Sequence, residues 1–390
     1  MPARASILFL SNGHGEDAIA VSIIKTLFSL APQEPLELRA FPSVDDGKAY
    51  SALGVERLGP LQVMPSGGLL LHSPRLFVAD MRAGFLSMTW QQLKVLRSLE
   101  CDCLVCVGDI YALWLSRLVK SPRRLCVQTL VSRHHHTEGG KITRLNRYFM
   151  ENISPLERSL MRKQDEVFVR DELTAEFLRA KGVKQARFVG SPLLDLLRDD
   201  VFAEPMLRGQ GFIVLLPGSR AYAQNSLNIM LQALDHLSRE RGQSVRALVA
   251  LVDDRLHPME GWRVYQEAFQ EQGYLASWGK GLVQVHAFLD RFSAILEAGD
   301  VTLATSGTAS EQAAAKGLDV VSFPVEGGIQ QAFLDNQKRL LKEALHLVGA
   351  EPMAIACKVG ELLMGQKTKV VRDGVGASEG IARAILEYVR

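Results

Sequence analysis

The sequence has little of what marks secreted or membrane-spanning chains. No apolar run approaches the roughly 18 residues of a spanning helix, and the apolar run 7–10 is too short for the core of a signal peptide. Neither charge dominates, because 45 Lys and Arg oppose 43 Asp and Glu, which argues against bulk nucleic-acid binding. Only five cysteines occur in 390 residues, as fits a reducing compartment. The sequence therefore predicts a cytoplasmic protein.

Two of the cysteines form a Cys-x-x-Cys pair that resembles a metal-binding motif. Cys103 and Cys106 lie in the apolar run 103–107, which predicts a buried strand. Residues three apart on a strand point to opposite faces, so the two sulfurs are not placed to share a metal ion. We expect buried, reduced thiols.

What the chain does contain is a repeated pattern of short apolar runs separated by helical segments. Its length, with 47% hydrophobic and 23% charged residues, predicts a globular protein of about two domains. Strands are predicted at 6–10, 36–40, 103–107, 125–131, 166–169 and 187–189, then at 212–216, 246–252, 282–285, 301–304 and 320–323. This order is typical of α/β folds with parallel sheets. The predicted linker is the charged stretch 198–211, which contains Pro and Gly.

Both halves open in the same way. The strand at 6–10 runs into the polar loop 11–17 before a helical pattern that starts at Ala18, and the strand at 212–216 runs into the loop 217–220. Open α/β sheets bind ligands at the carboxyl ends of their strands. The expected fold is therefore two doubly wound, Rossmann-like domains facing a cleft.

A second loop of the C-terminal half has the composition of a phosphate site. The segment 305–311 follows the apolar run 301–304 and leads into a helical pattern. Its small residues allow close approach to the backbone, and the free amides at a helix start suit a phosphate. Glu311 could accept hydrogen bonds from sugar hydroxyls. An ordinary βα turn without a ligand has the same pattern.

Charge and apolar side chains are unevenly distributed in the first half. Residues 117–163 carry eleven Lys and Arg against three Asp and Glu. The segment from Leu69 to Trp90 is rich in large apolar residues interspersed with Arg75 and Arg82. An apolar face beside basic residues is what an interfacial helix uses on an anionic membrane. In the alternative interpretation the apolar residues are core and the arginines form a solvated face.

Several of these segments resemble those of a known enzyme. The segments 215–220 (LLPGSR), 306–311 (SGTASE) and 188–193 (FVGSPL) look like equivalent parts of lipid-A-disaccharide synthase. Residues 67–97, followed by 105–110 (VCVGDI), resemble its membrane-facing region and the acidic strand end after it. The resemblance covers nearly the whole chain. It implies the GT-B fold, a UDP-sugar donor and a lipid-linked acceptor.

The first loop departs from that enzyme. Lipid-A-disaccharide synthase carries Gly-Glu-x-x-Gly-Asp there, whereas here Glu16 and Asp17 are adjacent. The segment 11–17 (SNGHGED) instead resembles the group described as lipid-A-disaccharide-synthase-related. More distantly, the chain is similar to the peptidoglycan GlcNAc transferase and to monogalactosyldiacylglycerol synthase. The identities of the donor and acceptor therefore do not carry over from lipid-A-disaccharide synthase.

The resemblance assigns the donor to the second half. The predicted nucleotide-binding residues are Gly218, Ser219, Arg220, Ser306, Gly307, Thr308, Ala309 and Glu311. In this assignment the 306–309 backbone and Arg220, whose planar fork suits two oxygens, hold the diphosphate, and Glu311 holds the ribose. Gln330 and Gln331 are candidates for the donor sugar. The donor is a substrate, and no cofactor is predicted.

A glycosyl transfer also needs a base for the acceptor hydroxyl. His14 is one candidate, because histidine titrates near neutrality and the galactolipid relatives place a histidine in a similar turn. Asp109, at the end of a predicted strand, is the other. The supporting residues of the first loop are Gly13, Gly15, Glu16 and Asp17. His14 could instead hydrogen-bond the turn, and the two carboxylates could satisfy free amides at the helix start.

No metal site is predicted. The three histidines 134–136 are adjacent, and adjacent side chains rarely converge on one ion. No Asp-x-Asp motif occurs in the sequence, and the resemblance implies a metal-independent enzyme.

The prediction as a whole is a UDP-sugar-dependent glycosyltransferase acting on a lipid-linked or amphipathic acceptor. It would bind the inner membrane face through Leu69 to Trp90 and the basic stretch 117–163. The predicted domains are 1–200 for the acceptor and membrane, 208–375 for the nucleotide sugar, and a helix at 376–390 that crosses back to the first domain. A nucleotide-sugar 2-epimerase and a non-catalytic nucleotide-sugar-binding module are the alternatives.

Overall fold

The computed structural model describes residues 4–33, 35–43, 47–60, 84–129, 131–133, 153–197, 200–208, 211–365 and 376–389, and the account below concerns those residues. The chain divides into two compact units. The first comprises Met1–Leu196 together with Gly374–Arg390, and the second comprises Leu197–Asp373. They are called the first and the second domain, and each is described by itself.

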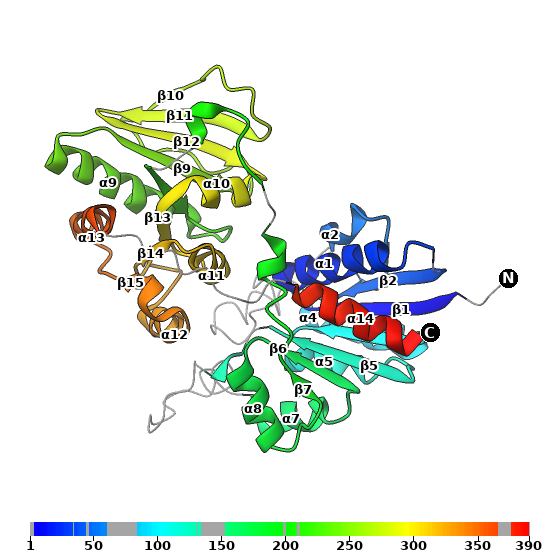
Figure 1. The fold of residues 1–390 in the computed structure, drawn as a ribbon. Coiled ribbons are helices and arrows are strands. Elements are labelled where there is room, and N and C mark those ends of the chain that lie inside the picture. The colour runs from blue at the N-terminus through cyan, green and yellow to red at the C-terminus, as the bar shows by residue number, and fades with distance from the viewer. Residues whose placement is uncertain are drawn as a thin grey trace. The chain divides into compact units, whose positions relative to one another are not determined.

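The first domain is built on a seven-stranded sheet in the order β3-β2-β1-β4-β5-β6-β7 (Figure 1). Its strands are β1 Ala5–Ser11, β2 Leu36–Pro42, β3 Glu56–Arg57, β4 Cys103–Val107, β5 Arg123–Gln128, β6 Glu166–Val169 and β7 Ala186–Arg187. Every neighbouring pair is parallel. Ser11 lies opposite Val107 in the pairing of β1 with β4. The carboxyl ends of these two strands therefore meet.

Helices cover both faces of this sheet. They are α1 His14–Leu30, α2 Lys48–Ser51, α4 Phe85–Ser98, α5 Ile110–Ser116, α7 Pro155–Met161, α8 Glu172–Ala180 and α14 Ala377–Val389, with a 3-10 turn η3 at Leu194–Leu196. Ile7 and Phe9 of β1 pack with α1 and α14, whereas Leu8 and Leu10 pack with α5, α7 and α8. This alternation follows from the two-residue period of a strand.

The cysteines of β4 follow the same alternation. Cys103 belongs to the core under α1 and α14, and Cys106 belongs to the core on the opposite face. Both are unpaired and buried, and burial raises the pKa of each thiol. The prediction of buried, reduced thiols on opposite faces is confirmed.

The last helix of the chain packs in the first domain. Ile381 and Ile385 of α14 are fully buried in the core that α1 also lines. Asp195, in a turn that precedes the second domain in sequence, accepts hydrogen bonds from the amides of Gly376 at 2.6 Å and Ser378 at 2.5 Å. A carboxylate at this position satisfies amides that have no partner inside the helix.

The second domain has an eight-stranded sheet in the order β10-β11-β12-β9-β8-β13-β14-β15. Its strands are β8 Phe212–Leu216, β9 Val245–Leu251, β10 Arg263–Tyr265, β11 Tyr274–Lys280, β12 Val283–Leu289, β13 Gly299–Ala304, β14 Asp319–Ser322 and β15 Leu345–Leu347. The six strands from β12 to β15 in this order are parallel. β10 and β11 are antiparallel and extend one edge.

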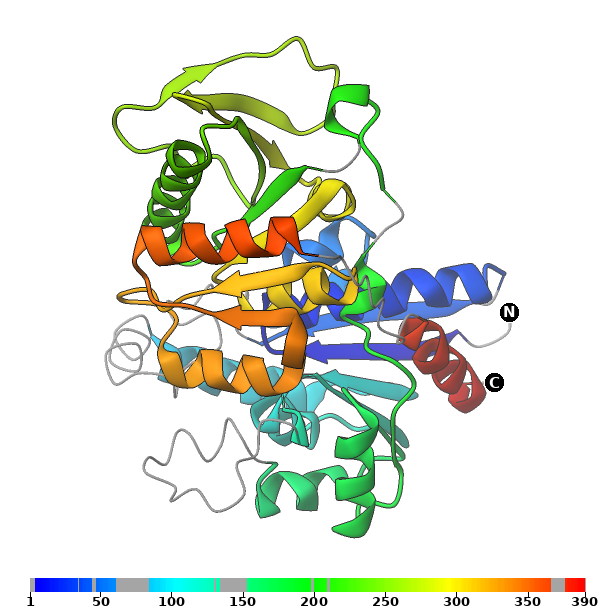
Figure 2. The same ribbon diagram turned by 60° about the vertical axis from the view of Figure 1, so that its left-hand side comes forward.

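Helices again lie on both faces (Figure 2). They are α9 Ala223–Arg241, α10 Phe292–Ala298, α11 Gly307–Ala315, α12 Gln331–Leu341 and α13 Pro352–Met364, with 3-10 turns η4 at Pro205–Leu207 and η5 at Lys342–Ala344. α9 and α13 share one core with the sheet, and α10, α11 and α12 share the other. The expected fold class, two doubly wound Rossmann-like domains, is confirmed.

Two features of the fold differ from the expectation. α1 begins at His14 rather than at Ala18, because most of the expected polar loop is the helix's first turn. The chain also passes from β9 to β12 through β10 and β11 instead of directly. The turn between β11 and β12 has only two residues, and Gly281 there has the left-handed φ of 57° that short hairpins favour.

Candidate functional site

The structure brings the two predicted donor loops together. β8 and β13 are adjacent and parallel, with Leu216 opposite Ala304, so the segments that follow them emerge side by side. The Thr305 amide donates to the Leu216 carbonyl at 3.1 Å, and the Thr305 hydroxyl donates to the Pro217 carbonyl at 3.1 Å. These bonds tie the loop 217–220 to the start of α11.

The start of α11 is open to an anion. Ser306 is the residue before the helix, and its side chain makes no capping hydrogen bond. The first amides of a helix have no carbonyl partner within it, and their dipoles favour negative charge. Thr308 is exposed, whereas Ser306, Gly307 and Ala309 are half-buried. The backbone of 306–309 can therefore accept a phosphate from the solvent side.

Two glycines give this region its close packing. A Cβ on Gly307 would lie 2.7 Å from Cζ of Phe333, so α11 approaches α12 more closely than any side chain permits. Gly218 has a φ of 89°, in the left-handed region that favours glycine. A Cβ there would lie 3.7 Å from Cβ of Ser306, which shows how near the two loops are.

Arg220 and Ser219 are exposed beside the same loops. Within the described part of the chain, no carboxylate forms an ion pair with Arg220. The sequence did not point to Tyr222, which packs underneath. A Cβ on Gly328 would lie 2.4 Å from Cγ of its ring, and its hydroxyl is 3.5 Å from the Thr305 carbonyl oxygen. Tyr222 thus supports both the phosphate-type loop and the loop before Gln330.

The remaining predicted donor residues lie on α11 and α12. Glu311 is half-buried in α11, in the turn after Ser306–Ala309. Gln330 is the residue before α12 and is exposed. Gln331 is also exposed, and its amide donates to Asp335 Oδ1 at 2.9 Å within the helix. Gln330 is therefore better placed than Gln331 to contact a ligand.

The glycine-rich turn of the first domain is anchored from below. The Ser11 hydroxyl donates to Asp17 Oδ1 at 2.5 Å and lies 2.7 Å from the Tyr50 hydroxyl. All three side chains are buried. Burial, reinforced by the nearby Asp17 carboxylate, raises the pKa of Tyr50 well above its usual value. The hydrogen bond from Ser11 to Asp17 therefore anchors the turn from inside.

The other residues of the turn lie at the start of α1. Gly13 immediately precedes the helix, and His14 is its first residue; the side chain of His14 is outside the described part of the chain. A Cβ on Gly13 would lie 2.6 Å from Glu16 Oε2, so the Glu16 carboxylate folds back over the turn. A Cβ on Gly15 would meet open space.

Asp109 lies two residues after the end of β4 and caps α5. Its Oδ1 accepts a hydrogen bond from the Tyr111 amide at 2.8 Å and another from Nδ2 of Asn12 at 2.6 Å. Burial raises the pKa of Asp109, whereas hydrogen bonds from the Tyr111 and Ala112 amides and from Asn12 lower it. The side chain keeps some solvent exposure. A partly exposed carboxylate at a strand end can accept a proton.

Sequence reasoning missed a buried glutamate in the same domain. Glu157 of α7 is only 3% exposed, and its Oε1 accepts a hydrogen bond from Nε2 of Gln128, at the end of β5, at 3.0 Å. Burial, with a smaller contribution from Asp109, raises the pKa of Glu157 to about 7. No local motif marks this residue, because its environment is created by the packing of α7 on the sheet.

The raised pKa of Glu157 predicts a pH-dependent stability. Between pH 4.5 and about 7 the folded protein binds more protons at Glu157 than the unfolded chain does. The contribution of Glu157 to the free energy of unfolding is therefore full below pH 4.5 and is lost as pH rises through 7. The loss is of the order of 3 kcal/mol at about 1.4 kcal/mol per pKa unit. Glu157→Gln should remove this loss, so its urea midpoint relative to the parent should rise between pH 5 and pH 8. Glu172→Gln, at an exposed site on α8, is the control, and parallel curves for Glu157→Gln and parent would contradict the assignment.

The predicted membrane segment falls mostly outside the described residues. Residues 61–83 are not described, nor are 134–152, which include the three adjacent histidines. Trp90 of α4 is 65% exposed, whereas Met88 is buried. No helix in the described ranges has the length and apolar character needed to cross a bilayer. Within the same ranges no cluster of three His, Cys, Asp or Glu side chains could hold a metal ion.

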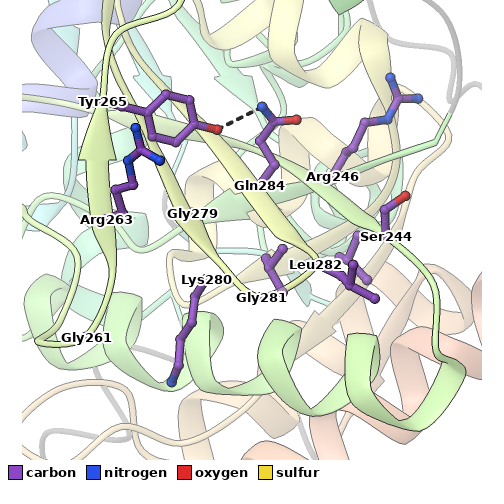
Figure 3. Close-up of a pocket in the computed structure, with 12 residues that line it drawn as sticks. Ser244, Arg246, Gly261, Arg263, Tyr265, Gly279, Lys280, Gly281, Leu282 and Gln284 are labelled. Carbon is purple, nitrogen blue, oxygen red and sulfur yellow. Dashed lines mark hydrogen bonds between the residues drawn. The ribbon is translucent and has the colours of Figure 1, made fainter.

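A cavity of about 610 Å³ lies elsewhere in the second domain, at the amino ends of β9 and β12 (Figure 3). Arg246, Arg263 and Lys280 line it, but Lys280 is paired with Asp235 at 3.0 Å. The guanidinium of Arg263 stacks on Tyr265, whose hydroxyl accepts a hydrogen bond from Gln284. None of the predicted site residues lines this cavity. The cavity lies at the amino ends of its strands, whereas the donor loops follow the carboxyl ends of β8 and β13.

Comparison with known proteins identifies the fold. No family model and no curated protein matches the sequence. Among solved structures, the UDP-GlcNAc 2-epimerase of Methanocaldococcus jannaschii in complex with UDP-GlcNAc and UDP is 12% identical, with a TM-score of 0.54 over 98% of this chain and 99% of that chain. MurG of Acinetobacter baumannii is 11% identical, with a TM-score of 0.53 over 98% and 99%. The glycotransferase of kitacinnamycin is 15% identical, with a TM-score of 0.56 over 100% and 96%. At these identities the likeness shows the fold alone, and the chain has the two-domain GT-B fold of these proteins.

Proposed function

We propose that this protein is a UDP-sugar-dependent glycosyltransferase. The observation that carries the proposal is the junction of the loop 217–220 with the uncapped start of α11, beside the exposed Arg220. Backbone amides, a helix dipole and a guanidinium together match a diphosphate. One of the solved structures with this fold is a UDP-GlcNAc 2-epimerase in complex with UDP-GlcNAc and UDP, and this supports the same class of donor.

The proposed reaction divides the work between the two strand-end sites. Asp109 removes the proton from the acceptor hydroxyl, and the freed oxygen attacks the anomeric carbon of the sugar. The bond between that carbon and the phosphate oxygen breaks, and UDP leaves with the electron pair. Arg220 and the amides of 306–309 stabilise the charge that develops on the diphosphate, and Glu311 holds the ribose. His14 is the other candidate base.

The acceptor in this proposal is lipid-linked or amphipathic. It is supported by the resemblance to lipid-A-disaccharide synthase, by the apolar segment that ends at Trp90 and by the basic stretch 117–163. Both lie in the first half of the chain, together with Asp109. Binding to the inner membrane face through these segments is part of the same proposal.

A second candidate is a nucleotide-sugar 2-epimerase, because several solved structures with this fold have that name. One experiment separates the candidates. The purified protein is incubated with UDP-GlcNAc, UDP-glucose or UDP-galactose, with and without vesicles of a total bacterial lipid extract. UDP release that depends on the vesicles supports the transferase. Conversion to an epimeric UDP-sugar without vesicles supports the epimerase.

Two further outcomes are informative. Tight binding of UDP without turnover in either condition supports the non-catalytic alternative. Failure to bind UDP or any of the three UDP-sugars would contradict the donor assignment altogether. Parallel assays with and without EDTA test whether the transfer is metal-independent, as the proposal assigns charge stabilisation to Arg220 and the α11 amides.

A further inference from the structure

Asn12 and Asp109 follow two different strands of the first domain and meet at the carboxyl ends of those strands. Asn12 follows β1, and Asp109 follows the adjacent parallel strand β4. The Asn12 side chain is only 6% exposed, and its Nδ2 donates to Asp109 Oδ1 at 2.6 Å. The two residues are 97 positions apart in sequence, so the contact is a product of the fold.

Gly108 fixes the orientation of the Asn12 amide. Its φ is 150°, and a Cβ at this position would lie 1.9 Å from Asn12 Oδ1. Any other residue would therefore push the Asn12 side chain away from Asp109. The Asn12 Oδ1 atom is buried and has no hydrogen-bond partner among the described residues. An unpaired buried oxygen is unfavourable. The hydrogen bond that Nδ2 of the same amide donates to Asp109 must therefore offset this cost.

The hydrogen bonds around Asp109 favour the ionised form of its carboxyl group and fix the orientation of that group. The amides of Asn12 and Tyr111 both donate to Oδ1, and donors stabilise the ionised form of a carboxyl against burial. Among the described residues, Asp109 affects the titration of Cys106 on β4, the Tyr111 phenol on α5 and Glu157 on α7, and none of these three is a cation. The hydrogen bonds from neutral donors thus oppose the effect of burial, which raises the pKa of Asp109.

We propose that Asn12 is a positioning residue that holds Asp109 ionised and turns its second oxygen, Oδ2, toward the acceptor hydroxyl. The inference rests on the proposed function, in which Asp109 is the base. Asn12 does not touch the reacting atoms. It acts through the carboxylate, with Gly108 as the residue that permits the contact.

The test is a direct titration of Asp109 by carbon NMR of its labelled carboxyl group, which needs no substrate. Asn12→Ala should move the midpoint upward by about one pH unit, since one donor to the charged form is lost. The acidic limb of the kcat/KM profile for UDP release should move by the same amount. Tyr111→Phe is the control: it removes the hydroxyl that donates to Gln92 at 3.0 Å but leaves the Tyr111 amide on Asp109.

Gly108→Ala should disrupt the same hydrogen bond by displacing the Asn12 side chain. It keeps the test valid if Asn12→Ala fails to fold. It should produce the same upward shift, and the double variant should add nothing further. Glu157→Gln is combined with each variant, so that its titration near neutrality does not distort the curve. An unchanged midpoint in both single variants overturns the inference, even if UDP release persists. A shifted midpoint in a protein that releases no UDP supports the positioning role while contradicting the proposed function.

Discussion

Replacement of Asp109 by asparagine should lower the rate of UDP release by about 10²–10⁴-fold, the range for loss of a general base. The substitution is nearly isosteric, and asparagine caps a helix as well as aspartate does. The side-chain oxygen of the asparagine can still accept the hydrogen bond from the Tyr111 amide, which in the parent protein donates to Asp109 Oδ1 at 2.8 Å. The fold and the binding of UDP should therefore be unchanged, with the loss confined to kcat. Steady-state kinetics and a UDP titration measure the two quantities separately.

Asp171→Asn is the matched control for this variant. Asp171 also precedes a helix of the first domain, α8, and accepts from the Thr174 amide at 2.8 Å. It should retain the parent rate within about twofold, since a capping change alone costs only a few tenths to about 2 kcal/mol of stability. If Asp109→Asn keeps full activity, Asp109 is a structural cap and His14 becomes the candidate to test.

Thr308→Asp should weaken UDP binding by about 100-fold or more while leaving the fold at least as stable. Thr308 is exposed at the second position of α11, where a carboxylate interacts favourably with the helix dipole by about 0.3–1 kcal/mol. The same carboxylate would repel the diphosphate, and like charges in contact cost several kcal/mol. Stability and affinity are thus expected to change in opposite directions. Thermal unfolding and calorimetric titration with UDP check the two signs.

Thr308→Asn controls for size and polarity without charge. It should bind UDP within a few-fold of the parent protein. Equal UDP affinity in Thr308→Asp and Thr308→Asn would place the diphosphate away from α11. In that case the loop 217–220, with Arg220 as its one cationic side chain, would have to bind it without the helix.

The donor loops could be predicted from sequence because their structure is local. Each is a buried apolar strand followed within a few residues by small residues and a helix, as in 212–220 and 301–311. Residues such as Phe212–Leu216 are buried throughout, so their apolar run marks the strand unambiguously. Loops at the carboxyl ends of adjacent parallel strands then meet as a consequence of topology.

The missed elements depend on contacts that the local sequence does not encode. β11, Tyr274–Lys280, mixes apolar, small and polar residues and becomes a strand because it pairs with β12 near the edge of the sheet. β3 and β10 are shorter still. Tyr50 and Asn12 acquire their roles from partners 39 and 97 residues away, and Glu157 acquires its raised pKa from tertiary burial. Local patterns carry no signal for such pairs.

The position of α14 has a consequence for the order of folding during synthesis. Because Ile381 and Ile385 complete the core beneath α1, the N-terminal half of the chain emerges from the ribosome with that core uncovered. The described residues of the second domain lie between Leu197 and Gly365, so all of them are synthesised before α14. The first domain therefore completes its core only after the second domain has been synthesised. Until α14 has been synthesised and packs against it, the apolar face of α1 remains exposed to chaperones.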